Sequence, residues 1–97
     1  QLLQNADKMG RAIRDGLRAR IGEFPEVVDI RGRGLMIGIE LDRPCGELVA
    51  QARDAGLLIN VTADSVVRLL PSLNIHQADV DTLVERLSDV ITRFLGK

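Results

Sequence analysis

The chain has 97 residues, a formal charge of −1 and only two aromatic rings of the Phe, Tyr or Trp type, so it offers little to nucleic acid or to a charged membrane surface. No apolar run approaches the roughly 20 residues of a membrane span, and no secretory signal is visible. The single Cys45 cannot form an internal disulfide and has no Cys or His near it in sequence to indicate a metal site. The length allows one modest core, and together these features predict a cytoplasmic protein.

The first predicted element is an amphipathic helix over residues 1–22. Its apolar residues recur at steps of three and four, at Leu2, Ala6, Met9, Ile13, Leu17 and Ile21. Gly10 and Gly16 each cost a helix about 1 kcal/mol relative to alanine, so this helix is expected to depend on tertiary packing. Because Gln1 opens directly into the helical pattern, the chain is interpreted as the end of a longer one.

A β-hairpin is predicted next, with strands over residues 27–31 and 35–41. The second strand alternates apolar and other residues, and the simplest connection is a turn or bulged bend at Gly32–Gly34. The Gly-Arg-Gly spacing does not match a dinucleotide or phosphate loop, so a structural turn is preferred. Gly38 inside the strand indicates a packing need or, less often, close approach by another backbone or a ligand.

The second half of the chain repeats the alternation of helix and strands. The predicted elements are a helix over 47–55, strands over 57–61 and 66–70, a loop at 72–74, and a helix over 77–95. Cys45 is interpreted as a thiol in a loop or at a helix start. His76, the only histidine, lies near the start of the last helix and is assigned a structural or surface role.

The resulting order is α-β-β-α-β-β-α over one domain, residues 1–97. Short connections between consecutive strands favour an α/β fold of the two-layer α+β kind, with a mostly antiparallel four-stranded sheet and the helices on one face. No complete catalytic set of residues is visible in this pattern.

Arg68 is the strongest candidate for a functional residue. It interrupts an apolar strand in which Val66, Arg68 and Leu70 face one side while Val67 and Leu69 face the other. A guanidinium is always charged and needs acceptors for its donors. The residues alone leave two alternatives, an internal ion pair, which is somewhat favoured, and the binding of a ligand carboxylate.

Three segments in this order and spacing resemble a known family. They are Val27–Leu41 with R-G-x-G-L-M-x-G-I-E, Ala55–Asn60 with A-G-L-L-I-N, and Val66–Ile75 with V-V-R-L-L-P. Together they resemble the small C-terminal domain of the class III, fold-type I, pyridoxal-phosphate-dependent aminotransferases, and among these the acetylornithine aminotransferases.

The resemblance implies a function for a longer protein. In the family, a large domain carries pyridoxal 5'-phosphate and its Schiff-base lysine, the small domain closes over the amino-acid substrate, and the enzyme is a homodimer. Residues 1–22 would lead in from the large domain, and residues 23–97 would form the small domain proper. Arg68 matches the arginine that binds the substrate carboxylate. The implied reaction moves an amino group between N-acetylornithine and 2-oxoglutarate in arginine biosynthesis, and the exact amine stays open.

The sequence also departs from the family pattern. Ser72 stands where a second proline is common, and His76 stands where serine or threonine usually begins the helix. The only lysines, Lys8 and Lys97, do not resemble a buried Schiff-base lysine, so the chain alone is expected to be inactive and to hold no catalytic or cofactor-binding residue. Without a large domain, the face that would contact it should be exposed and apolar. The alternative is a free-standing α/β module that binds a partner or an effector.

Overall fold

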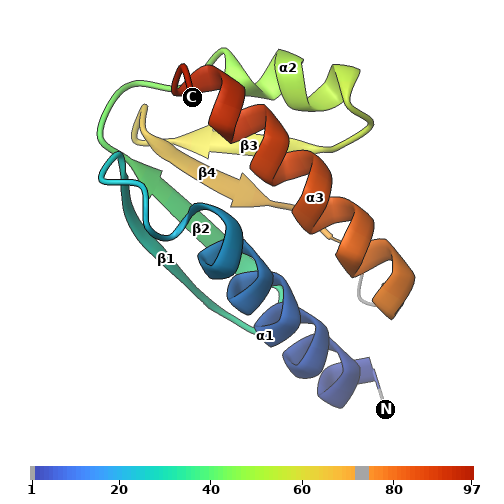
Figure 1. The fold of residues 1–97 in the computed structure, drawn as a ribbon. Helices are drawn as coiled ribbons and strands as arrows, with labels where there is room; N and C mark the ends of the chain where they lie inside the picture. The colour runs from blue at the N-terminus through green and yellow to red at the C-terminus, as the bar shows by residue number, and fades with distance from the viewer. Residues whose placement is uncertain (1, 72–74) are drawn as a thin grey trace.

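The computed structural model describes residues 2–71 and 75–97. The predicted loop at 72–74, including Ser72, and the first residue, Gln1, lie outside the described residues. The elements follow the predicted order (Figure 1): α1 (Leu2–Ile21), β1 (Val27–Arg33), β2 (Met36–Leu41), α2 (Leu48–Asp54), β3 (Ile59–Thr62), β4 (Val66–Leu69) and α3 (Gln77–Phe94).

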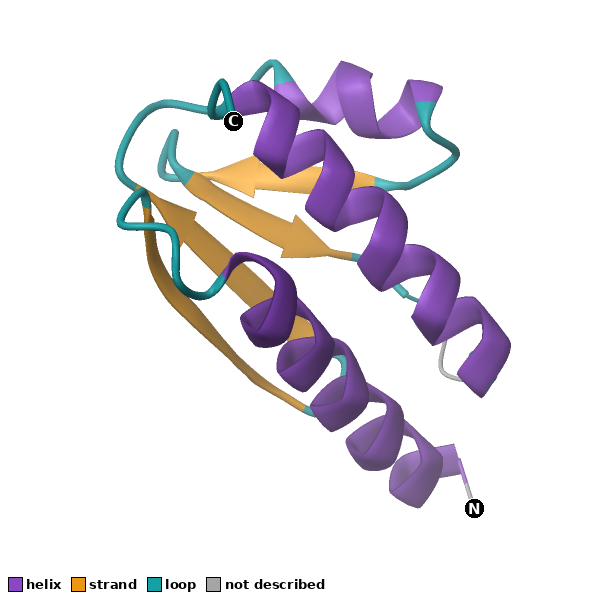
Figure 2. Ribbon diagram, viewed as in Figure 1, coloured by secondary structure: helices purple, strands orange, loops and turns teal. Residues whose placement is uncertain are grey.

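The strands form one antiparallel sheet in the order β1-β2-β4-β3. Helices α1 and α3 contact each other and lie over the same face of this sheet, while α2 lies beside α3 near the β3 edge (Figure 2). The predicted two-layer architecture is therefore confirmed. Neighbouring strands are all antiparallel, so β2 and β3, which both run opposite to β4, are parallel to each other. The chain joins these two strands through α2, and β4 lies between them in the sheet, so this connection is a crossover.

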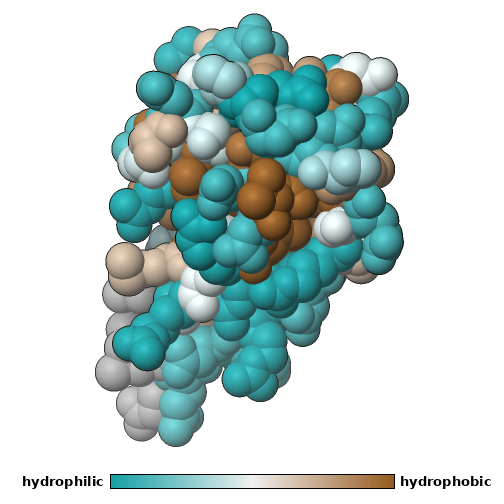
Figure 3. All heavy atoms as spheres, turned by 90° about the vertical axis from the view of Figure 1, so that its left-hand side faces the viewer, coloured by the Kyte–Doolittle hydropathy of each residue, from teal (hydrophilic) through white to brown (hydrophobic). Residues whose placement is uncertain are grey.

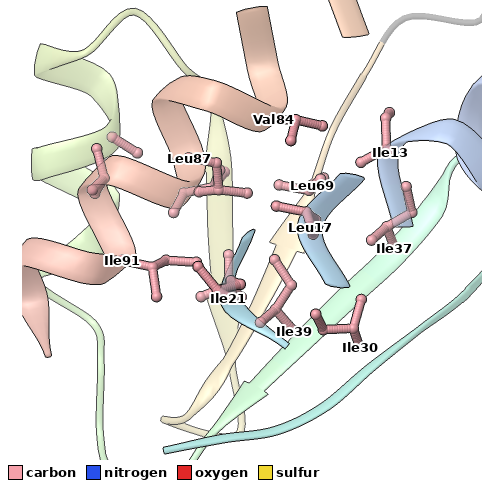
Figure 4. Close-up of a cluster of buried hydrophobic side chains, with 14 of the residues drawn as sticks. Ile13, Leu17, Ile21, Ile30, Ile37, Ile39, Leu69, Val84, Leu87 and Ile91 are labelled. Carbon is pink, nitrogen blue, oxygen red and sulfur yellow. The ribbon is translucent and has the colours of Figure 1, made fainter. Parts of the chain in front are cut away.

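The core lies between the sheet and the helices. Alternate residues of the strands point toward the helices, where they meet the apolar stripes of α1 and α3 (Figure 4). The fully buried side chains at the centre include Ile13, Leu17, Ile21, Ile39, Val67, Leu87 and Ile91. Burying each such leucine or isoleucine contributes about 1.5–3 kcal/mol. The alternation predicted for residues 35–41 is confirmed, because Leu35, Ile37, Ile39 and Leu41 are buried and Met36 between them is exposed.

The first hairpin turns later than predicted. Gly32 and Arg33 remain in β1 and pair with Ile37 and Met36, so the connection is a two-residue turn at Gly34 and Leu35. Only Gly34 has a positive φ there, +55°, as a type II′ hairpin requires at its first central position. The predicted break at Gly32–Gly34 was placed too early because glycine permits a turn without forcing one. The register irregularity lies at the other end of β1, between Val27 and Asp29.

The same turn explains Gly10, the costly glycine of the first helix. A Cβ at Gly10 would lie 1.7 Å from the carbonyl oxygen of Gly34, so only glycine lets α1 lie against the hairpin. Two arginines of α1 add hydrogen bonds to the hairpin backbone: Arg14 donates to the Gly34 carbonyl at 3.2 Å and Arg18 to the Ile30 carbonyl at 2.8 Å. The helix therefore depends on tertiary packing, as its sequence predicts.

β3 begins two residues later than predicted. The backbone N–H of Leu57 donates to the Ala52 carbonyl at 2.8 Å, which keeps Leu57 bound to the end of α2 and out of the sheet. Leu58 follows and is 75% exposed. The strand pattern starts at Ile59, whose side chain is buried. The sequence pattern could not show this later start. The last carbonyls of α2 need hydrogen-bond donors, and Leu57 supplies one of them in place of joining the strand.

Candidate functional site on the open face of the sheet

The sheet leaves one face without helices, which we call the open face. The strand pairing places four residues in one row across this face: Arg31 of β1 pairs with Gly38 of β2, Gly38 with Arg68 of β4, and Arg68 with Asn60 of β3. Side chains on one face of neighbouring strands stand about 4.5–5.5 Å apart when their residues are directly opposite. The row therefore brings together residues from all four strands.

Arg68 lies at the centre of this row and is exposed. Its neighbours Val67 and Leu69 are buried, so the predicted division of the strand into two faces is confirmed. Arg68 forms no hydrogen bond or ion pair with any residue that the structure describes, so the internal ion pair weighed from the sequence is not formed there. The guanidinium lines a hollow of about 470 Å³ together with Met36, Asn60 and others.

Arg31, at the edge of the same row, differs from Arg68 because it is paired with carboxylates of its own sheet. It donates hydrogen bonds to Glu40 at 3.0 Å and to Asp29 at 3.2 Å. The hydrogen bond with Glu40, and after it the one with Asp29, raise the pKa of the Arg31 guanidinium above its ordinary value. Two carboxylates thus already accept hydrogen bonds from Nη1 of Arg31, whereas Arg68 keeps its donors available for an anion from elsewhere.

Gly38 separates these two arginines. A Cβ at this position would meet only Val66 at 3.5 Å and the Val67 carbonyl at 3.9 Å, which are ordinary contacts. The packing need that the sequence favoured for Gly38 is therefore not found. The missing side chain instead leaves space beside Arg68, in a second hollow of about 610 Å³ that Arg31, Gly38 and Arg68 help to line.

Large apolar side chains are exposed beside Arg68. Met36, Leu70 and Leu58 are 66%, 62% and 75% exposed. Met36 and Leu70 line the same hollow as Arg68, whereas Leu58, which precedes β3, lines a neighbouring hollow with Leu70 and with Leu83 of α3. Figure 3, turned so that the left-hand side of Figure 1 faces the viewer, shows hydrophobic side chains gathered in the middle of a hydrophilic surface. Exposed apolar groups around an unpaired cation suit a surface that another part of a protein covers.

The two lysines lie away from the open-face row. Lys97 pairs with Glu26 at 3.3 Å and stands 5.0 Å from the centre of the Phe24 ring, and Lys8 is an exposed residue of α1. A Schiff base with pyridoxal phosphate needs a desolvated lysine amine. Lys8 is exposed and Lys97 is paired with Glu26, so neither amine has the desolvated surroundings that such a lysine needs.

His76 and Cys45 have structural surroundings. His76 is the N-cap residue of α3, where its backbone N–H donates to the Asp79 carboxylate at 3.3 Å. Cys45 precedes α2 and is fully buried, and burial raises the pKa of its thiol.

Within the described ranges, no three His, Cys, Asp or Glu residues are grouped to hold a metal ion, and no helix is long and apolar enough to cross a membrane.

Asn60 is the site residue that the sequence did not single out. In the sequence it is only the end of the A-G-L-L-I-N segment. The pairing register of β3 with β4 places it opposite Arg68. Register depends on the length and conformation of the turn between the strands, which here contains positive φ angles at Ala63 and Asp64. No signal within the sequence of β3 itself would have identified Asn60.

Comparisons with known proteins agree on the relationship. The model of the family described as aminotransferase class-III matches residues 1–91. Acetylornithine aminotransferase 1 of Bordetella bronchiseptica is 47% identical over 96 residues, which cover 99% of this chain and 24% of that protein. The N-acetylornithine aminotransferase structure from Stenotrophomonas maltophilia K279a superimposes with a TM-score of 0.85 at 32% identity, covering 98% of this chain and 27% of that one. The ornithine delta-aminotransferase structure of Plasmodium falciparum gives a TM-score of 0.88 at 27% identity, covering 96% and 25%. This chain thus spans about a quarter of the length of the relatives it matches.

Proposed function

The chain belongs to the class-III aminotransferase family, and we propose that it is the small C-terminal domain of a pyridoxal-phosphate-dependent acetylornithine aminotransferase. The complete protein would transfer an amino group between N-acetylornithine and 2-oxoglutarate in arginine biosynthesis. It would be a cytoplasmic homodimer. The observation that carries the proposal is the unpaired Arg68 on the open face, within a chain whose relatives are named for this activity.

In this proposal Arg68 binds the carboxylate of the amino-acid substrate. Its fork of donors fits the two oxygens of a carboxylate, and no described carboxylate of the chain competes for it. Because Arg68 belongs to a paired central strand, the backbone holds its direction. Arg68 would therefore orient the substrate and leave the chemistry of the amine to groups outside this chain.

The exposed apolar residues around Arg68 support contact with a large domain. Met36 and Leu70 would be covered when that domain lies over the open face. Closure would also remove water from around Arg68 and so strengthen its interaction with the carboxylate. In this arrangement residues 1–22 lead in from the large domain, and residues 23–97 form the small domain proper.

Pyridoxal phosphate would be held by the large domain. The cofactor supplies the electron sink for the transfer of the amino group when it is bound. Since neither Lys8 nor Lys97 lies in the open-face row, this chain by itself is expected to show no turnover.

The test is an assay of the complete protein loaded with pyridoxal phosphate, with N-acetylornithine and 2-oxoglutarate as substrates. We expect glutamate formation, and faster turnover with N-acetylornithine than with ornithine or 4-aminobutyrate. The 97-residue chain assayed in the same way should form no glutamate. A complete protein that forms none with any of these amines would contradict the proposed function, and turnover by the short chain would contradict the placement of the cofactor.

A further inference from the structure

We propose that Asn60 is a second substrate-binding residue, which donates a hydrogen bond to the same carboxylate that Arg68 binds. This inference rests on the proposed function and adds a residue to its site. It starts from the pairing of β3 with β4, in which Asn60 is directly opposite Arg68. Both side chains are exposed and line the same hollow of about 470 Å³.

The orientation of the Asn60 amide follows from its hydrogen bond. The backbone N–H of Val61 lies 2.9 Å from one atom of the amide group. A backbone N–H can only donate, so this atom is the oxygen, Oδ1. The other atom, Nδ2, therefore carries both amide protons away from the Val61 N–H. No described residue accepts from Nδ2, so its two protons are available to a ligand.

The position beside Arg68 matches what a carboxylate requires. A carboxylate offers about four lone-pair sites, of which a bidentate arginine occupies two. On the other side of Arg68 the paired residue is Gly38, which has no side chain. Asn60 is thus the directly opposite neighbour of Arg68 that can fill a remaining site with a neutral donor. A neutral donor suits this place, because an acid there would pair with Arg68 as Glu40 does with Arg31.

The hydrogen bond from Val61 also prepares Asn60 for binding. It fixes the rotamer of the amide before the substrate arrives, which reduces the conformational entropy that binding would cost. The two ends of the amide therefore have different roles: Oδ1 accepts from the Val61 N–H within the fold, and Nδ2 donates to the ligand. A substitution can remove the Nδ2 donor and keep the oxygen acceptor.

The experiment compares Asn60→Asp with Asn60→Ala in the complete, pyridoxal-phosphate-loaded protein. Aspartate keeps an oxygen for the Val61 N–H but loses the donor and places a negative charge opposite Arg68. Alanine loses both functions without adding charge. We expect KM for both N-acetylornithine and 2-oxoglutarate to rise about tenfold to a hundredfold in Asn60→Ala, the scale of one hydrogen bond to a charged group. In Asn60→Asp the rise should be larger, with kcat changing less than KM in both variants.

A purely structural role predicts a different result for the uncharged variant. If Asn60 only satisfies the Val61 N–H, Asn60→Ala should lower the melting temperature and leave KM for both substrates at the wild-type value, while Asn60→Asp should raise KM only because its carboxylate pairs with Arg68. An unchanged KM in Asn60→Ala with an active wild type would overturn the inference and leave the proposed function standing. A wild-type protein without aminotransferase activity would overturn both.

Discussion

The two faces of this sheet are made by the same strands but have different tasks. On the covered face, Ile39, Val67 and Leu69 are buried against the helices. On the open face, the residues between them are Gly38, Arg68 and the exposed neighbours of Arg68. Because side chains alternate along a strand, the chain can keep a dense apolar core on one side and present charged and apolar groups on the other. Stability and substrate recognition should therefore respond to different residues of the same strand.

The open face itself contains a second contrast, between two arginines in one row. Arg31 is held by Glu40 and Asp29, whereas no described carboxylate lies within ion-pair distance of Arg68. An arginine that is already paired within its own sheet serves the surface of the fold. An unpaired one, set among exposed apolar groups, is available for a ligand. Both arginines are exposed, so pairing and not exposure is what distinguishes Arg68, the residue proposed to bind the substrate, from Arg31.

The largest effect on stability should come from the covered face. Replacing the fully buried Ile39 with alanine removes buried methyl groups and leaves a cavity, at an expected cost of about 2–5 kcal/mol in the free energy of unfolding. The matched control is Met36→Ala in the same strand, which is 66% exposed and should change that free energy by less than about 0.5 kcal/mol. Denaturant unfolding followed by circular dichroism measures both. An equal loss of unfolding free energy in the two variants would contradict the claim that only the covered face of the sheet supports stability.

Replacing a glycine with alanine should have an intermediate effect on the free energy of unfolding. The sign should differ between Gly10, which packs against the hairpin, and Gly38 on the open face. Helix propensity alone predicts that Gly10→Ala stabilises the protein by about 1 kcal/mol. We expect a loss of about 1–3 kcal/mol instead, because the new Cβ would collide with the Gly34 carbonyl. Gly38→Ala on the open face meets only ordinary contacts and should be neutral or stabilising by up to about 1 kcal/mol. Thermal unfolding of both variants tests the pair, and a stabilised Gly10→Ala would contradict the close contact of α1 with the hairpin.

The smallest effect concerns the buried thiol of Cys45. Burial raises the pKa of Cys45 in the folded protein, so at alkaline pH the unfolded chain loses its thiol proton first. Stability from this residue is therefore complete at neutral pH and falls as the pH rises through the unfolded thiol's pKa of about 8.5. Cys45→Ala should show a weaker decline in melting temperature between pH 8 and pH 10 than the wild type. If the melting temperature of the wild type declines between pH 8 and pH 10 no more than that of Cys45→Ala, the raised pKa of Cys45 would be contradicted.

The covered face was largely predictable from the sequence, because burial imposes periodicity. Steps of three and four identified both long helices, and alternation identified the strand faces, including that of Arg68. The turn at Gly34 was misplaced by pattern alone, because three residues in a row could all enter a turn. Gly10 was expected only to weaken its helix, and its close contact with Gly34 depends on how α1 crosses the hairpin.

The open face was less predictable, because its function depends on pairs that are distant in sequence. Arg68 was identifiable as a charge in an apolar strand, but its lack of a partner could be seen only in three dimensions. Asn60 was not identifiable at all, since its place opposite Arg68 comes from the register of two short strands. A residue whose role depends on its neighbours across a sheet leaves no periodic trace in the sequence.

The most direct test of the account is a comparison of Arg68→Lys with Arg31→Lys in the complete enzyme, measuring kcat/KM for N-acetylornithine together with the melting temperature. Lysine keeps the charge but loses the planar fork of donors. We expect Arg68→Lys to raise KM and to lower kcat/KM by the equivalent of about 2–4 kcal/mol with little change in melting temperature, and Arg31→Lys to leave kcat/KM nearly unchanged. Unchanged kinetics in Arg68→Lys, or an equal loss in both variants, would contradict the assignment of the unpaired arginine to the substrate carboxylate.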